Sequence, residues 1–172
     1  MANSNYRQIG DAIGAEVAAL PEAGRLHLYQ RWAADIGRYI DLFRWRAQDG
    51  KDQIRGWVLT RESAREELGS FASSAPGGFV PAGVNRRTHT FLLFGVMSLE
   101  DDAASEIEFQ DLIESICGRF RAGDALRLRG NISSLERLTP PQVDRIDLRA
   151  FGSTLCHTAE VRIQAIERIV RA

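Results

Sequence analysis

The sequence has little lysine, little cysteine and no long hydrophobic run. Lys51 is the only lysine among 22 lysine and arginine residues in a chain of 172 residues. The two cysteines, Cys117 and Cys156, lack CxxC spacing and are too few for a disulfide framework, so we expect both to be reduced core residues. No stretch approaches the roughly 18 consecutive apolar residues of a membrane helix, and the first residues lack the order of a signal peptide. We therefore expect no membrane insertion and a protein that stays in the cytoplasm where it is made.

The overall composition is that of an ordinary globular domain. Hydrophobic residues make up 44% of the chain and charged residues 26%, which is enough apolar content to form one core. The formal net charge is −1, so no overall electrostatic attraction to nucleic acid or anionic membrane is expected. The preference for arginine is compatible with an interface protein, and a GC-rich coding sequence would produce it as well. We predict a single domain over residues 1–172.

The hydrophobic periodicity predicts an α+β fold with a mixed or antiparallel sheet of about four strands flanked by helices. Residues 1–46 are expected to hold two N-terminal helices, and a third helix follows Ser98 and continues to about Arg121. The strand at Thr88 to Met97 is apolar on both faces and should be central. The expected helices and strands occupy residues 5–20, 29–45, 54–61, 88–97, 98–121, 143–151 and 154–165, with a tight turn at 152–153.

Residues 62–87 are predicted to form a long flexible loop, because small and polar residues crowd around residues 70–78. Phe71 and Phe79 lie in this stretch and have no local element that would bury them. Such a loop either folds back on the core or is held for a partner.

The motifs of catalysis and cofactor binding are weak. Cys156 and His157 suggest a nucleophile and a base, but adjacent side chains of a strand point to opposite faces. His27 or His89 could supply the base instead, although nothing local positions either one, and the three histidines lack metal-ligand spacing. No nucleotide-binding glycine motif occurs. We therefore predict no catalytic, cofactor-binding or metal-binding residue, and a small Cys/His hydrolase remains an alternative.

One segment is locally basic, and it gives a further alternative. Arg119, Arg121, Arg127 and Arg129 could contact a phosphate backbone, but acidic neighbours dilute their field. A solvated face or an acidic protein partner is the preferred interpretation. A nucleic-acid binder would show a basic face and a steep salt dependence.

Several short segments resemble the tail terminators, and closely related neck proteins, of long-tailed bacteriophages and prophages. These segments are residues 24–32 (GRLHLYQRW), 56–61 (GWVLTR), 87–91 (RTHTF), 105–113 (SEIEFQDLI) and 151–157 (FGSTLCH). The resemblance implies a virion protein, assembled in the bacterial cytoplasm, that forms a ring and is usually a hexamer. Such a ring caps the head-proximal end of the tail tube and then binds the head-neck connector, while DNA only passes through the lumen. It implies no enzymatic residues.

The same resemblance suggests where a partner would bind. Arg61, Phe71, Phe79, Arg86 and Arg87 are the candidate contacts with the tail tube or with a neighbouring subunit, and the predicted loop would become ordered on docking. The N-terminal section, up to about residue 46, is longer than in the smallest terminators. Another neck component, a head-completion or stopper protein, is therefore the nearest alternative.

Overall fold

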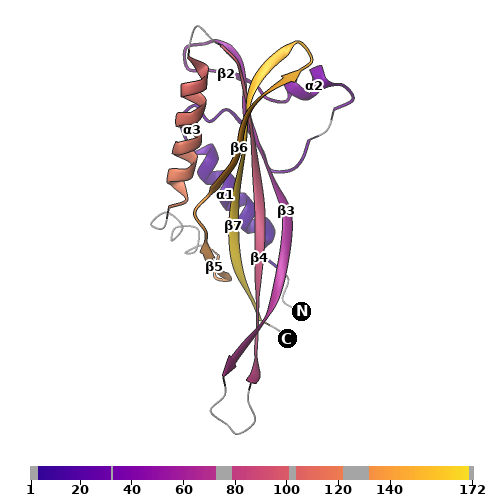
Figure 1. Ribbon diagram of the computed structural model, residues 1–172, viewed down its shortest axis with the longest axis vertical. Coiled ribbons are helices and arrows are strands. Elements are labelled where there is room, and N and C mark those ends of the chain that lie inside the picture. The colour runs from indigo at the N-terminus through magenta and orange to yellow at the C-terminus, as the bar shows by residue number, and fades with distance from the viewer. Residues whose placement is uncertain (1–3, 32, 73–78, 101–103, 122–131, 171–172) are drawn as a thin grey trace.

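The computed structural model describes residues 4–31, 33–72, 79–100, 104–121 and 132–170, with only the backbone described for 69–72 and 79–82. Within these residues the chain folds as α+β, with three helices and one mixed sheet of seven strands (Figure 1). In chain order the elements are α1 (Tyr6–Ala18), β1 (Arg25–His27), α2 (Ile36–Asp41), β2 (Arg44–Arg46), β3 (Asp52–Ala72), β4 (Phe79–Ser98), α3 (Ser105–Arg119), β5 (Leu135–Leu138), β6 (Gln142–Phe151) and β7 (Thr154–Val170).

Three long strands form the centre of the sheet. The strand order is β1-β3-β4-β7-β5, with β2 also paired to β3 and β6 also paired to β7. β1 runs parallel to β3, and every other described pairing is antiparallel. The prediction that residues 88–97 form a central strand is confirmed, because β4 lies between β3 and β7 and contributes side chains to the apolar clusters on both faces of the sheet.

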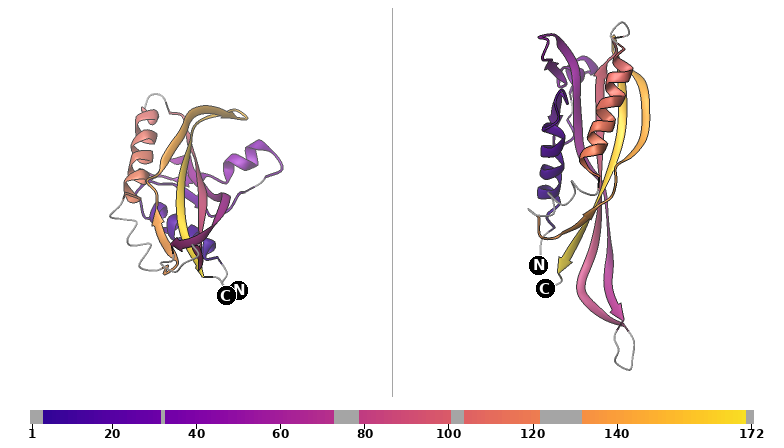
Figure 2. Two further views of the ribbon diagram at one scale, coloured as in Figure 1. Left: turned by 60° about the horizontal axis from the view of Figure 1, so that its bottom comes forward. Right: turned by 90° about the vertical axis from the view of Figure 1, so that its left-hand side faces the viewer.

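The two faces of the sheet carry separate apolar clusters. The larger cluster joins α1 and α3 to the sheet, and we call this side the α1 face. The smaller cluster contains Ile40, Phe43, Val58, Val96 and Cys156 and lies under α2. Figure 2 shows α2 and α3 on opposite sides of the sheet. Strand alternation therefore sends successive side chains of β4 and β7 into two different cores.

Two of the predicted segments are wrong in their secondary structure. The expected helix at 29–45 is reduced to α2, and the chain then turns into β2. Asp35 caps α2 by accepting a hydrogen bond from the Arg38 backbone N–H at 2.8 Å. The helix ends early because Phe43 must enter the smaller cluster and Trp45 must pair with β3.

The expected loop at 62–87 is instead the distal part of a long β3–β4 hairpin, apart from residues 73–78, which lie outside the described residues. We call residues 62–72 and 79–87 the arm. Where its side chains are described, the arm has no residue in either core cluster, so these parts of its strands lack the hydrophobic alternation that would have predicted them. Figure 1 shows that its distal end projects beyond the rest of the molecule.

The expectation of about four strands is also wrong, since the sheet has seven. The additional strands β1, β2 and β5 are only three or four residues long, which is too short to show a period of two. The helix at 5–20 and the 152–153 turn are confirmed by α1 and by the β6–β7 hairpin. The third helix begins at Ser105, later than expected.

Gly95 gives a direct test of packing at the sheet centre. A Cβ at this position would lie 2.3 Å from Trp57 Cζ3. The indole cannot easily turn away, because it stacks on Phe109 and its Nε1 donates to the Ala23 carbonyl oxygen at 3.0 Å. We expect Gly95→Ala to lower the free energy of unfolding in urea by about 2 kcal/mol. Gly118→Ala is the control, since a Cβ there meets nothing within 4 Å; equal stabilities of the two variants would contradict this packing.

Candidate functional site

All five predicted contact residues lie on the β3–β4 hairpin. Phe71 and Phe79 lie in the strand ends that border residues 73–78, and their side chains are outside the described part of the chain. Arg61 lies where the arm joins the rest of the sheet, and Arg86 and Arg87 lie on β4 within the arm.

The three arginines do not form a single patch. The Arg61 guanidinium lies 4.0 Å from the centroid of the Tyr6 ring, a cation–π contact on the α1 face. Arg87 forms an ion pair with Glu66 across the hairpin. Arg86 alternates with Arg87 and so points to the opposite face, where it donates to Glu136 at 3.0 and 3.1 Å.

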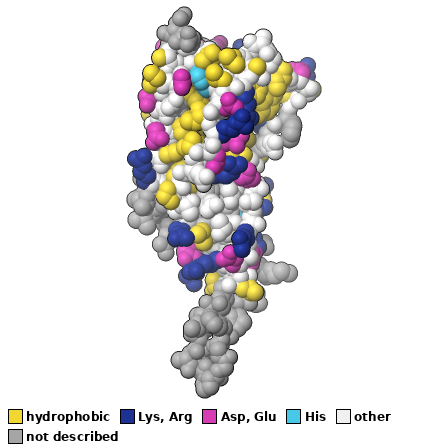
Figure 3. Space-filling view, viewed as in Figure 1, with side chains coloured by type: hydrophobic (Ala, Val, Ile, Leu, Met, Phe, Trp, Pro, Cys, Tyr) yellow, Lys and Arg dark blue, Asp and Glu magenta, His cyan; other side chains and the backbone are white. Residues whose placement is uncertain are grey.

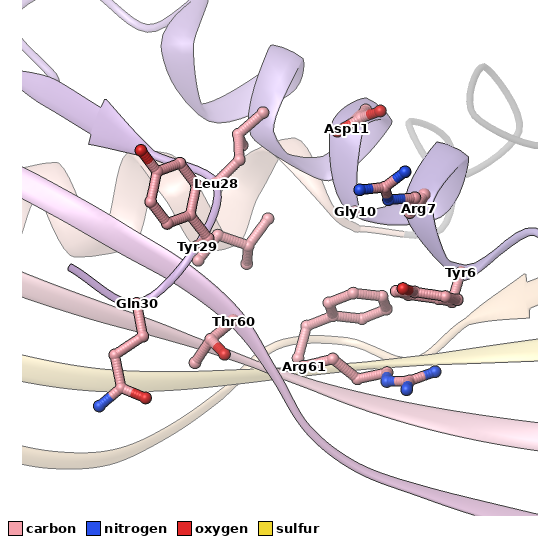
Figure 4. Close-up of a pocket in the computed structure, with 11 residues that line it drawn as sticks. Tyr6, Arg7, Gly10, Asp11, Leu28, Tyr29, Gln30, Thr60 and Arg61 are labelled. Carbon is pink, nitrogen blue, oxygen red and sulfur yellow. The ribbon is translucent and has the colours of Figure 1, made fainter.

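A hollow of about 660 Å³ lies beside Arg61 (Figure 4). It forms because β1 pairs with β3 only as far as Val58, after which residues 28–30 leave the sheet. Leu59 and Phe91 are buried beneath it. Tyr6 and Tyr29 lie at the rim and are 37% and 62% exposed. The hollow therefore joins an apolar floor to a rim of aromatic and charged side chains.

The sheet has open edges on both sides. In the described chain β1 covers residues 56–58 of β3 and β2 covers residues 52–54, so no strand covers this edge from Leu59 to Ala72. At the other edge, β6 pairs with β7 alone among the described strands. Backbone N–H and C=O groups along an uncovered strand are a template for pairing with another chain.

The β6 edge also carries exposed apolar side chains. Val143, Ile146 and Leu148 are 37%, 45% and 50% exposed. Their register with β7 places all three on the α1 face. Figure 3 shows hydrophobic side chains gathered over the upper part of this side of the molecule. We call Val143, Ile146 and Leu148 the β6 strip.

A buried polar network lies where the N-terminal end of α1 meets the sheet. Glu167 is 1% exposed and His89 is fully buried, with His89 Nε2 lying 2.9 Å from Glu167 Oε2. The Ser4 hydroxyl donates to Oε2 at 2.6 Å, and the Asn5 backbone N–H donates to Oε1 at 2.7 Å. Ser134 donates to Oε1 at 3.0 Å. The network therefore ties four sequence-distant segments together, and it was not predicted from the sequence.

Ser4, His89 and Glu167 have the composition of a catalytic triad but not its geometry. The Ser4 Oγ lies 3.3 Å from His89 Nε2, the same nitrogen that meets Glu167. A triad needs the hydroxyl and the carboxylate at opposite ring nitrogens. His89 Nδ1 is buried without a hydrogen-bond partner among the described residues. The arrangement fits a structural role, in which Ser4, Asn5, His89, Ser134 and Glu167 together hold the N-terminal end of α1. We call these five residues the clasp.

The buried side chains of Glu167, His89 and His157 predict that the free energy of unfolding falls in acid. Burial lowers the pKa of His89 despite its contact with Glu167, and burial also lowers the pKa of His157. Burial alone would raise the pKa of Glu167, but its hydrogen bonds outweigh this and lower it. As pH falls below about 6.5, the unfolded state binds protons first at the histidines. As pH falls further through about 4.5, the stability contributed by ionised Glu167 is lost as well.

We therefore expect the free energy of unfolding to fall by about 1–2 kcal/mol between pH 7.5 and pH 5. Urea unfolding at fixed ionic strength measures this. A stability that is unchanged or higher at pH 5 would contradict the buried neutral histidines.

Cys156 and His157 face opposite sides of β7, as predicted. Cys156 belongs to the smaller cluster, and burial raises the pKa of its thiol to about 11. His157 faces α3, where its Nε2 lies 3.0 Å from the Ser105 hydroxyl and its ring stacks on Phe109. A thiol with this pKa holds little thiolate at neutral pH, so the geometry does not favour Cys156 as a nucleophile.

Within the described residues, no group of histidine, cysteine, aspartate and glutamate side chains could hold a metal ion. None of the helices in this part of the chain is both long and apolar enough to span a membrane. Comparison of the chain with models of protein families and with curated proteins finds no match.

Proposed function

We propose that this chain is a structural subunit that assembles into a ring, and that the ring caps the head-proximal end of a phage tail tube. The observation that carries the proposal is the combination of a projecting arm with two open edges on opposite sides of one sheet. Open edges allow copies to join, and the arm supplies a surface for a different partner.

The arm is suited to binding a partner, because its described side chains belong to neither core cluster. Ordering a strand costs about 1–2 kcal/mol per residue in backbone entropy, which the described arm does not recover by entering a core cluster. Leu68 on the arm is 74% exposed. A large exposed leucine on a paired strand is consistent with a surface that becomes buried against a partner.

Ring formation follows from using two different surfaces. When one surface of a subunit binds a different surface of the next, the contacts are heterologous and the assembly closes if the rotation allows it. A hexamer is the stoichiometry that the resemblance implies. The ring would bind the tail-tube protein on one side and the head-neck connector or stopper protein on the other, with DNA passing through the lumen.

The nearest alternative is another neck component, a head-completion or stopper protein. The N-terminal section supports keeping it, because α1 and α2 add a helix to each face of the sheet and β1 and β2 add strands beside β3. Such a protein would bind the head-side connector and would not bind a bare tube.

Electron microscopy of gold-labelled protein mixed with preassembled tubes of the tail-tube protein encoded nearby tests this function. We expect label at one end of each tube and little along its sides. Tubes without label at either end would contradict the capping role, and label on the head-side connector alone would favour the alternative.

A further inference from the structure

We propose that β6 of one copy pairs in antiparallel fashion with the uncovered edge of β3 in the next copy, and that the β6 strip enters the hollow beside Tyr6 and Tyr29. The inference rests on the self-assembly in the proposed function and names its two surfaces. The partner is therefore a second copy of this chain.

The receiving edge begins where β1 ends. The uncovered stretch of β3 begins with Leu59, Thr60 and Arg61, and these three residues also line the hollow. An added strand at this position would continue the layer that β1 begins and would run over the hollow (Figure 4). Pairing would satisfy backbone groups that no described strand reaches.

The donating edge is β6, whose ten residues match the space available. The uncovered part of β3 runs from Leu59 to Ala72 and is longer than β6. Ile146 and Leu148 are about half exposed although they sit in a regular strand pair. Each would lose exposed apolar area on entering the hollow, and this burial stabilises the contact.

The strand directions of β6 and β3 are compatible with antiparallel pairing between two copies. β3, β4, β7 and β6 are successively antiparallel, so β6 runs opposite to β3 within one copy. A neighbour placed by rotation about an axis roughly along the strands keeps this direction. Its β6 then meets β3 antiparallel, which is the pairing used in most of this sheet.

The side chains of the β6 strip and the hollow also lie on the same face of the sheet. The β6 strip points to the α1 face, and the hollow opens between α1 and β3 on that same face. A continuous sheet keeps its faces from copy to copy, so the strip of one copy lies over the hollow of the next. The apolar floor formed by Leu59 and Phe91 suits aliphatic side chains. A register shift of two residues preserves this match, whereas a shift of one reverses it.

Disulfide cross-linking tests the contact with a face-matched control. The register of the hairpin puts Arg61 and Ala64 on the α1 face and Ser63 on the opposite face. We combine Ile146→Cys with Arg61→Cys or with Ala64→Cys, and in the control with Ser63→Cys. The native Cys117 and Cys156 are buried, and the unmodified protein serves as the background.

Mild oxidation of the assembled protein is followed by denaturing electrophoresis without reductant. We expect a ladder of covalent multimers for at least one of the two face-matched pairs, with a yield at least five-fold above that of the Ser63 control. The ladder should disappear in reductant, since disulfides require Cβ atoms within about 4.5 Å of each other.

Three results would overturn the inference. A dimer from Ile146→Cys alone would show β6 pairing with itself around a twofold axis. An assembled ring in which neither face-matched pair cross-links would refute this contact and leave the capping function standing. A protein that stays monomeric with and without the tube would remove both proposals.

A second variant separates the contact from folding. Ile146→Asp should raise the concentration needed for assembly at least ten-fold, because it places a charge in the apolar contact. Ile107→Asp is the matched control, since Ile107 is 65% exposed and belongs to α3 rather than to β6. Equal assembly by the two variants, with unchanged circular dichroism, would contradict the role of the β6 strip.

Discussion

Replacing Glu167 with alanine should lower the free energy of unfolding by about 3 kcal/mol, the largest loss we expect from one substitution. The carboxylate accepts hydrogen bonds from Ser4, from the Asn5 backbone and from Ser134, and it also meets His89. Alanine leaves these buried groups without their acceptor. Because Ser4 and Asn5 precede α1 directly, the N-terminal helix should also loosen from the sheet.

Urea unfolding and amide hydrogen exchange measure the two effects. Glu67→Ala is the control, since its side chain is 66% exposed and pairs with Arg65 on the surface. The control should change stability by less than about 0.5 kcal/mol. A loss in Glu167→Ala as small as in the control would show that the clasp contributes nothing, and unchanged exchange in α1 would show that it does not hold the helix.

Shortening the arm should abolish tube binding while leaving the fold intact. Glu67 and Arg86 are paired across the hairpin, so residues 68–85 can be replaced by Asn-Gly, which favours a two-residue type I′ turn. Among these residues, those whose side chains the structure describes, 68 and 83–85, belong to neither core cluster. We therefore expect the melting temperature to stay within a few degrees of the original, whereas affinity for the tube end should fall at least a hundred-fold.

Cosedimentation with tubes and scanning calorimetry give the two readouts. A milder variant, Leu68→Asp, removes the exposed apolar side chain without changing the hairpin length. It should weaken tube binding by about ten-fold. Full tube binding by the shortened protein would refute the proposed role of the arm, and tails of normal length in a phage carrying it would refute the role in capping.

The predictable parts of the fold are those with a strong period. Ile9, Ile13 and Val17 recur at helical spacing and do form the buried face of α1. The apolar run from Thr88 to Met97 identified the central strand because both of its faces contribute to an apolar cluster. These elements are determined by burial, and burial is what a hydrophobic pattern records.

The arm and the segment around α2 could not be predicted for the opposite reason. Residues 62–72 pair with β4 through backbone hydrogen bonds and surface ion pairs, which leave no apolar alternation in the sequence. Between residues 29 and 45 the apolar side chains are divided between α2, the smaller cluster and the surface, where Tyr29 is 62% exposed. The helical spacing of these apolar side chains therefore does not indicate one buried helix.

The candidate site could be predicted only in part. Arg61 was identified and does border the hollow, but the hollow depends on where β1 ends, which a three-residue strand does not reveal. The buried clasp did leave a signal, because Glu167 follows Val161, Ile163 and Ala165 on the apolar face of β7. A carboxylate in such a series needs buried donors, although the sequence does not say which residues supply them.

The most direct test of the account is the mass of the purified protein by light scattering, measured alone and after mixing with the tail-tube protein. We expect a ring of about six subunits, either free or formed only on the tube. A protein that remains monomeric in both samples would contradict the capping role and would direct the search to the head-side neck partners.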